Sequence, residues 1–214
     1  MQGRFKYPRT PHLPWSPGRG SDDLTLGDLS FFAGREVVVT EKLDGENTTL
    51  YRDGLHARSL DPRPHASRDW VKALQARIGW MIPQGWRLCG ENLFAVHSLR
   101  YTDLRSYFYL FSVWNERNVA LAWDDTLEWA ERLGLEVPDV LYRGVFDERR
   151  LRLLAQRLDP GRQEGYVQRL AGEIAYADFA FSVAKYVRAG HVTTDAHWLE
   201  RPVMRNGLRS GRRG

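Results

Sequence analysis

Residues 37–47 read VVVTEKLDGEN, a β-branched run followed by a lysine between two carboxylates. β-branched residues favour strands and an Asp-Gly pair favours a turn, so a strand is expected to end near Lys42. A lysine in this position is either a surface residue beside a turn or a nucleophile held in a pocket. This stretch alone leaves both interpretations open.

The composition of the 214 residues is that of one large folded domain, with 43% hydrophobic and 27% charged residues. A net charge of +4 and a pI near 9.3 suit a protein that binds a polyanion, although many basic proteins bind nothing acidic. Only four of the 31 basic residues are lysines, namely Lys6, Lys42, Lys72 and Lys185. Because arginine carries most of the positive charge, a lysine beside a turn favours a chemical role.

Neither a membrane span nor a secretory signal is recognisable in the sequence. No apolar run approaches the ~20 residues that cross a bilayer, and the N-terminal MQGRFKYPRTPHLPW lacks the apolar stretch of a signal peptide. The single Cys89 excludes an internal disulfide, and no cysteine cluster indicates a zinc site. We therefore expect a cytoplasmic protein that does not interact with membranes.

The pattern along the chain predicts a mixed α+β fold of antiparallel strands with helices packed outside them. We expect an extended N-terminal arm at residues 1–20, a single domain at 21–190 and a short basic C-terminal tail at 191–214. Asp53-Gly54 predicts a hairpin turn. Strands are expected at residues 35–43, 47–54, 54–60, 85–98, 106–116, 118–123, 164–170 and 179–190. Helices are expected at residues 24–33, 66–80, 127–135 and 147–158.

Five further segments follow KLDGEN in order along the chain. They are GLHARSL with Arg58, GENLFAVHSLRY with Glu91, FYLFSVWNE with Phe111, EGYV with Glu164 and Val167, and SVAKYVR with Lys185. This set, which covers residues 41–188, resembles the motifs of covalent nucleotidyltransferases, that is, polynucleotide ligases and messenger-RNA capping enzymes. It is most similar to that of ATP-dependent RNA ligases. The resemblance implies a nucleotidyltransferase (ATP-grasp-like) fold.

The resemblance also implies that Lys42 attacks the α-phosphate of ATP and keeps AMP covalently. A free lysine, with a pKa near ~10.4, is protonated at neutral pH and cannot attack. Burial beside a metal ion and a second cation disfavours the charged form. Lys185 is expected to bind the α-phosphate oxygens, and Mg²⁺, or Mn²⁺ in its place, to neutralise the charge that develops.

Other residues receive roles from the same resemblance. Glu91 is expected to contact the AMP ribose hydroxyl, and Phe111 and Val167 to cover the two faces of adenine. Glu164 is expected to position metal-bound water, and Asp44 to lie near the metal and the reacting strand ends. Each has a purely structural alternative, as a solvated strand residue, a core aromatic or a turn residue.

Further candidates flank these motifs. Glu41, beside Lys42, is expected to contact the nucleotide, and Glu46 is an additional candidate. Arg58 matches an intermediate arginine motif, with Arg52 as its competitor. The family's last motif has two lysines spaced by one residue, whereas here Arg188 comes one position late. On a strand that position points to the opposite face, which puts its contact with the nucleotide in question.

The last residues carry two minor signals. RNGLRSGRRG places four arginines among glycines, which indicates either a flexible cationic end that contacts phosphates or a terminus without a specific role. His191 and His197 are a poor metal pair without further ligands. Ligases of this superfamily usually carry a C-terminal domain, for which little chain remains after residue 190.

The resulting hypothesis is an ATP-dependent RNA ligase that joins 5′-phosphate and 3′-hydroxyl ends. A capping-type guanylyltransferase, a DNA ligase and a non-catalytic nucleic-acid-binding protein on a ligase scaffold are the alternatives. The expected partner is nicked or broken RNA, together with an end-healing kinase or phosphatase by family analogy.

Overall fold

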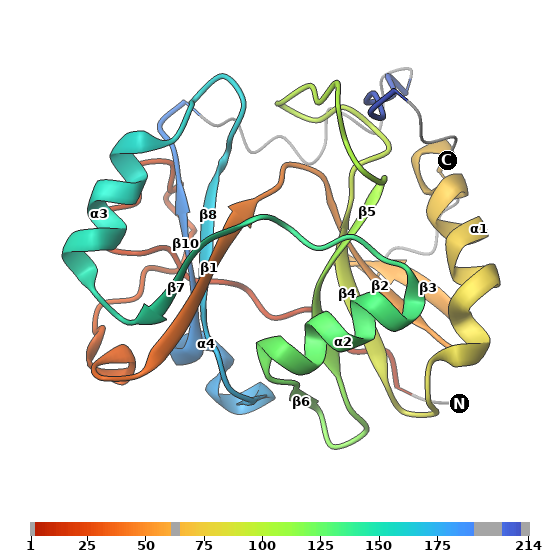
Figure 1. Cartoon of the computed structure of the whole chain (residues 1–214), viewed down its shortest axis with the longest axis horizontal. Coiled ribbons are helices and arrows are strands. Elements are labelled where there is room, and N and C mark those ends of the chain that lie inside the picture. The colour runs from red at the N-terminus through yellow and green to blue at the C-terminus, as the bar shows by residue number, and fades with distance from the viewer. Residues whose placement is uncertain (1–2, 61–64, 191–202, 211–214) are drawn as a thin grey trace.

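The computed structural model describes residues 3–60, 65–190 and 203–210, and its strands form two antiparallel sheets (Figure 1). The first sheet has the order β10-β8-β1-β7 and the second the order β3-β2-β4-β5-β6-β9. The first contains β1 (Glu36–Lys42), β7 (Val140–Val145), β8 (Gly165–Leu170) and β10 (Val183–Val187). The second contains β2 (Glu46–Tyr51), β3 (Gly54–Ala57), β4 (Arg87–Asn92), β5 (Phe108–Trp114), β6 (Val119–Ala120) and β9 (Ile174–Ala175).

Helix α3 lies at the outer side of the first sheet and α1 at the outer side of the second, whereas α2 lies between them in this view (Figure 1). The α-helices are α1 (Asp69–Ile78), α2 (Trp123–Leu133), α3 (Glu148–Arg157) and α4 (Phe179–Ser182). Short 3₁₀ turns are η1 (Ser30–Phe32), η2 (Ala66–Arg68), η3 (Gly79–Met81) and η4 (Tyr176–Asp178). The predicted mixed α+β architecture is therefore confirmed.

Local sequence explains where these helices begin and end. The Asp147 side chain accepts a hydrogen bond from the Arg150 backbone N–H and so caps α3. Gly134 ends α2 in the left-handed conformation, with φ of 63°. The Asp53-Gly54 turn joins β2 to β3 as predicted.

Two apolar layers hold the sheets and helices together. Val37, Val39 and Leu170 of the first sheet pack with Leu151 of α3. In the second sheet Leu50, Leu88 and Leu110 pack with the α1 residues Val71, Leu74 and Ile78. Alternation along β1 turns Val38 to the other face of the first sheet, where it packs with Trp123 and Ala171.

The predicted helix at residues 24–33 is wrong, since only the 3₁₀ turn Ser30–Phe32 forms there. The chain before it is extended because it pairs with the N-terminal segment: the N–H of His12 bonds to the carbonyl of Leu24, and that of Leu26 to the carbonyl of His12. The N-terminal segment in turn runs along β10, where Leu13 N–H donates to the Lys185 carbonyl and Lys185 N–H to the Pro11 carbonyl. Residues 11–13 therefore extend the first sheet beyond β10.

Residues 203–210 pack against the loop that follows β4. The Asn206 side chain is buried, and its Nδ2 donates to the carbonyls of Leu93 and Ala95 while its Oδ1 accepts from the Tyr101 N–H. The described residues of the predicted flexible cationic end are thus held against the loop after β4 by hydrogen bonds. His191 and His197 lie outside the described residues.

No helix among the described residues is long and apolar enough to span a membrane. The cytoplasmic location and the division into arm, domain and tail stay predictions.

Candidate active site

Lys42 is the last residue of β1 and projects between the two sheets. Its Nζ donates a hydrogen bond to Oε2 of Glu164 at 2.5 Å. The Lys42 side chain is 23% exposed and that of Glu164 only 3%. Because β1 and β8 are antiparallel, with Lys42 opposite Gly165, the two partners come together although they are 122 residues apart.

Gly165 allows this close approach of strands. A Cβ atom at this position would lie 1.9 Å from the carbonyl oxygen of Tyr186 in β10. Only glycine fits there, which gives a physical reason for the Glu-Gly pair of the EGYV segment. Lys185, two positions from Val187, is held on the same sheet opposite Val167.

The electrostatic environment keeps Lys42 protonated in the nucleotide-free protein. Burial lowers the pKa of Lys42, but the carboxylates of Glu164, Glu91 and Asp44 outweigh it, so the pKa is raised above its ordinary value. Lys185 differs, because burial and the nearby charge of Lys42 lower its pKa. Two lysines with opposite shifts therefore share one region of the site.

Glu91 of β4 lies beside Lys42 and accepts a hydrogen bond from the Gly45 N–H at 3.1 Å. Burial raises the pKa of Glu91 to about 8; Glu164 and Asp44 add to this, while Lys42 opposes it. Glu91 is therefore placed to hold the turn after Lys42 and to offer a partly protonated carboxyl group to a ligand.

Asp44 fixes the same turn from another direction. Its Oδ2 accepts from the Ser98 N–H, the Ser98 Oγ and the Leu99 N–H at 2.6–2.8 Å, and its own N–H donates to the Tyr101 hydroxyl. Asp44 is buried, so these bonds connect the Lys42 turn to the loop after β4.

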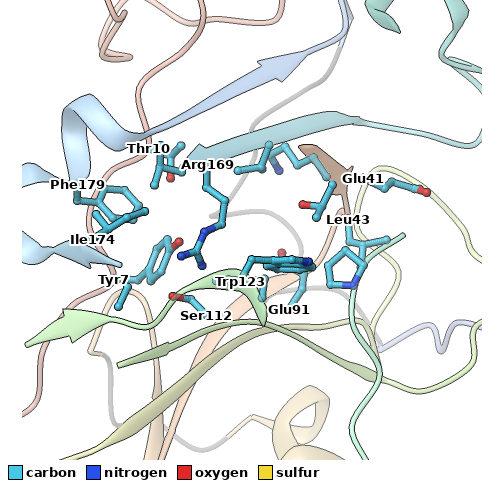
Figure 2. Close-up of a pocket in the computed structure, with 17 residues that line it drawn as sticks. Tyr7, Thr10, Glu41, Leu43, Glu91, Ser112, Trp123, Arg169, Ile174 and Phe179 are labelled. Atoms are coloured by element: carbon cyan, nitrogen blue, oxygen red, sulfur yellow. The ribbon is translucent and has the colours of Figure 1, made fainter. Parts of the chain in front are cut away.

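A narrow cavity of about 80 Å³ opens beside Lys42 between the sheets (Figure 2). Phe111 and Val167 both line it, from β5 and β8 respectively. Glu41 lines it as well, and burial raises the pKa of Glu41 despite a hydrogen bond with Gln163. The structure thus brings most of the nucleotide-binding candidates around one cavity.

Among the lining residues that sequence reasoning missed are Tyr7, Trp123 and Arg169 (Figure 2). Arg169 is buried, and its Nη2 donates to the carbonyls of Leu121 and Gly172. Burial without a carboxylate partner lowers its pKa to about 10. Its position two residues after Val167 on the same strand was a signal that could have indicated it.

Tyr7 belongs to the N-terminal segment and contacts Phe111 edge to face, with ring centroids 5.2 Å apart. Burial raises the pKa of its hydroxyl. The same segment contributes the buried His12, which hydrogen-bonds Ser16 and lies 3.4 Å from an Asp23 carboxylate oxygen. Burial lowers the pKa of His12 to about 4, with the charge of Lys185 acting in the same direction.

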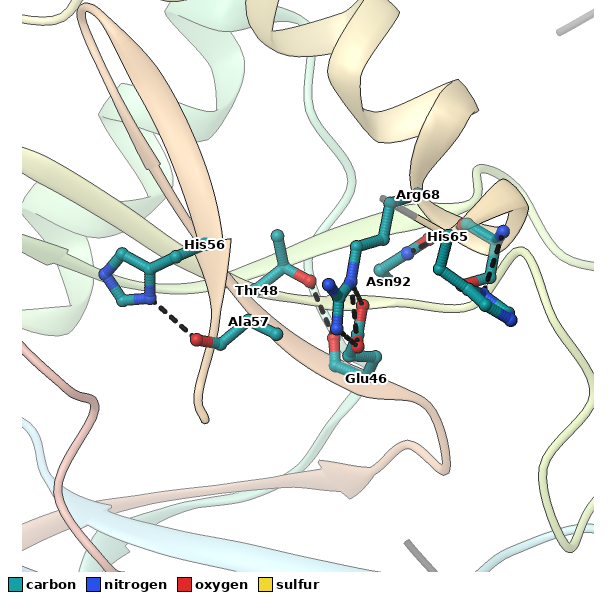
Figure 3. Close-up of polar contacts among 8 residues, drawn as sticks. Glu46, Thr48, His56, Ala57, His65, Arg68 and Asn92 are labelled. Carbon is teal, nitrogen blue, oxygen red and sulfur yellow. Dashed lines mark hydrogen bonds and ion pairs between the residues drawn. The ribbon is translucent and has the colours of Figure 1, made fainter. Parts of the chain in front are cut away.

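Four candidates lie at the margin of the site or away from it. Arg52 donates hydrogen bonds to the carbonyls of Trp80 and Ile82. Arg58 is nearer the site, because its positive charge acts to lower the pKa of both Tyr7 and Lys185. Glu46 is held by Arg68 in a forked ion pair (Figure 3). The N–H of Arg188, just past β10, donates to the Glu164 carbonyl, so its backbone supports the loop that carries Glu164.

In the described part of the chain, no group of three or more His, Cys, Asp or Glu residues is arranged to hold a metal ion. Glu164 offers one buried carboxylate beside Lys42. A Mg²⁺ ion commonly binds one or two carboxylates together with substrate phosphates, so this side chain fits a metal that arrives with a nucleotide.

The fold is that of a ligase-type nucleotidyltransferase. The sequence model of the RNA ligase family matches residues 35–187, and the chain belongs to this family. A comparison with curated proteins found no match.

Solved structures with similar folds include ligases from three sources. An archaeal ATP-dependent RNA ligase has a TM-score of 0.61 at 14% identity, covering 86% of this chain and 48% of its own. A putative ATP-dependent DNA ligase from Aquifex aeolicus has 0.57 at 17%, covering 86% and 50%. A Naegleria gruberi RNA ligase variant with ATP and Mn has 0.55 at 16%, covering 75% and 52%. This chain therefore spans about half the length of these ligases.

Proposed function

We propose that the protein is an ATP-dependent RNA ligase that forms a covalent lysyl-AMP intermediate on Lys42. The observation that carries the proposal is the position of Lys42, between Glu164 and Glu91 at the mouth of a cavity lined by Phe111 and Val167, in a chain of the RNA ligase family.

In the first step, Lys42 Nζ attacks the α-phosphorus of ATP, a P–N bond forms, and the P–O bond to pyrophosphate breaks. The proton on Nζ must leave before the lone pair can attack. Lys185 favours loss of the Lys42 proton, because the two positively charged ammonium groups repel each other. Lys185 also supplies positive charge for the α-phosphate oxygens. Nucleotide binding must also release Lys42 from Glu164.

The adenosine moiety occupies the cavity beside Lys42 in this proposal. Phe111 and Val167 cover the faces of the base, Glu91 contacts the ribose, and Glu41 contacts the nucleotide. The cavity of about 80 Å³ is smaller than the roughly 300–1,000 Å³ of small-molecule sites. Side chains that line it, such as Tyr7, must therefore move when ATP enters.

A divalent cation, Mg²⁺ or Mn²⁺, would be held by Glu164 and the nucleotide phosphates. When bound, it neutralises phosphate charge and offsets the carboxylates that keep Lys42 protonated. Asp44 stays a candidate ligand, although its Oδ2 is already engaged by the loop at Ser98 and Leu99.

In the following steps AMP passes from Lys42 to an RNA 5′-phosphate, and a 3′-hydroxyl then displaces AMP to seal the strand. DNA is the second candidate substrate, since the Aquifex aeolicus neighbour is described as a putative ATP-dependent DNA ligase. An end-healing kinase or phosphatase would supply the required termini, because only 5′-phosphate and 3′-hydroxyl ends can enter these steps.

The test is sealing of matched nicked duplexes with an RNA or a DNA nick, in the presence of ATP and Mg²⁺. We expect the RNA nick to be sealed faster and GTP not to replace ATP. Faster sealing of DNA would favour a DNA ligase, and use of GTP a capping-type enzyme. A protein that binds the nicks but releases no AMP with any nucleotide would be the non-catalytic alternative.

A further inference from the structure

A second and larger cavity, of about 560 Å³, adjoins the nucleotide cavity. Glu41 and Leu43, the sequence neighbours of Lys42, line both cavities. A ligand in the second cavity would therefore lie beside the residues that flank Lys42, which itself lines the nucleotide cavity. The remaining walls come from the loop after β4, the segment after α3 and the docked C-terminal residues.

Acidic side chains in this second cavity are largely engaged by their neighbours. Arg105 forms ion pairs with Asp139 at 2.8 Å and with Glu136 at 2.9 Å. Asp159 accepts a hydrogen bond from the Gly161 N–H at 2.8 Å. Burial raises the pKa of Glu41 toward the neutral form. Asp139 is thus paired with a cation, whereas Asp159 is held by a neutral N–H donor.

Two arginines of the same cavity remain available. Among the residues that the structure describes, Arg100 and Arg209 form no ion pair, and both are exposed. Arg162 contributes a third positive charge, held only by a long contact of 3.8 Å with the exposed Asp103. Four arginines and four carboxylates line this cavity, and among the described residues Arg100 and Arg209 are the two of these arginines without an ion-pair partner.

The docked C-terminal segment holds Arg209 in place. Its backbone N–H donates to the Leu104 carbonyl at 2.9 Å, and Leu104 N–H donates to the Gly207 carbonyl at 3.0 Å. Asn206 locks the same segment through its buried side chain. The backbone is fixed while the guanidinium stays exposed, as expected for a residue that meets a polyanion.

We propose that the second cavity binds the sugar-phosphate backbone of the 5′-phosphorylated RNA strand and directs its end to Lys42, through Arg100 and Arg209. The inference rests on the ligase function proposed above and names where its nucleic-acid substrate enters. Guanidinium groups bind phosphates through forked hydrogen bonds, and neutralised phosphates make binding dependent on salt. A polar cavity with exposed arginines suits this backbone, whereas the neighbouring apolar cavity suits a base.

The test compares the wild type, the double variant Arg100→Ala/Arg209→Ala and the control Arg77→Ala/Arg149→Ala. The control arginines are exposed, lie on α1 and in the first turn of α3, and line neither cavity. Binding of a nicked RNA duplex with a 5′-phosphate is measured by fluorescence anisotropy over a range of salt concentrations. Charging of Lys42 by ATP without RNA, and release of AMP from the charged protein on addition of this RNA, are measured separately.

We expect the double variant to bind the RNA about tenfold more weakly and its salt slope to fall by roughly 1.4–1.8, while the control matches the wild type. AMP transfer should fall with RNA affinity, relative to the rate of Lys42 charging. Equal RNA affinity of the two double variants would overturn the inference. The inference would also be overturned if Arg100→Ala/Arg209→Ala lowered the charging of Lys42 by ATP as much as it lowered RNA binding. The cavity would then hold the pyrophosphate portion of the nucleotide. RNA binding is measured without catalysis. A wild type in which ATP transfers no AMP to Lys42 would therefore refute the ligase function, while the RNA affinities would still test the second cavity.

Discussion

Lys42 Nζ and Glu164 Oε2 lie 2.5 Å apart in a partly buried ion pair that joins the ends of two neighbouring segments of the first sheet. The pair holds the proposed nucleophile in place and also keeps it protonated. A ligand that binds Glu164 or adds positive charge nearby would weaken this hold. In the proposed function, Lys42 therefore becomes reactive when nucleotide and metal bind together.

Glu164→Gln should lower the pKa of Lys42 in the nucleotide-free protein, because it removes the charge and the acceptor that raise this pKa. With only four lysines in the chain, the Lys42 signal can be followed by NMR of isotope-labelled lysine across a pH titration. The exposed Lys72, paired with Asp69, serves as an internal control and should not shift. An unchanged or raised Lys42 pKa would contradict the ion pair.

Gly165→Ala should abolish charging of Lys42 and destabilise the protein, because the new Cβ would collide with the Tyr186 carbonyl and separate β8 from β10. Gly172→Ala is the matched control, since nothing lies within 4 Å of the Cβ added there. Thermal unfolding and charging with labelled ATP measure both effects. Wild-type charging in Gly165→Ala would refute the proposed strand geometry.

Phe111→Ala should raise KM for ATP by about 5- to 150-fold, the loss of one base-aromatic stacking contact of roughly 1–3 kcal/mol. Trp80→Ala removes an aromatic ring that is 68% exposed on the α1 side of the molecule and should leave KM unchanged. The rate of Lys42 charging is measured against ATP concentration. If both variants have the wild-type KM, adenine does not stack on Phe111.

Asn206→Ala should destabilise the protein by about 2 kcal/mol, because the carbonyls of Leu93 and Ala95 and the N–H of Tyr101 lose their buried partner. A lower melting temperature, by roughly 4–8 °C, is expected for a chain of this size. Met204→Ala, in the same segment but 59% exposed, is the control. Equal melting temperatures for the two variants would show that the segment adds little to stability.

Motif spacing selected candidate residues that the fold brings close together, because the residues proposed to act on the nucleotide lie on or next to strands. Lys42, Glu91, Phe111 and Val167 each occupy a strand position whose face follows from alternation. Tyr7 could not be predicted, because it lies in an irregular segment and reaches Phe111 through contacts across more than a hundred residues.

Other parts of the fold were missed for local reasons. The strand β7 was not predicted because it is a sheet edge, with Val140 and Val145 exposed at its ends instead of an alternating buried face. Residues 24–33 have helix-capping residues before them, but Leu26 pairs with His12 instead. Tertiary pairing overrode local preference there.

The central claim is that Lys42 carries AMP. The most direct test is to incubate the wild type, Lys42→Ala and Lys72→Ala with α-labelled ATP and Mg²⁺, and to map the alkali-stable, acid-labile label by peptide mass spectrometry at neutral to alkaline pH. We predict that the wild type and Lys72→Ala carry AMP on Lys42 and that Lys42→Ala carries none. Absence of label from the wild type, or undiminished label in Lys42→Ala, would contradict the claim.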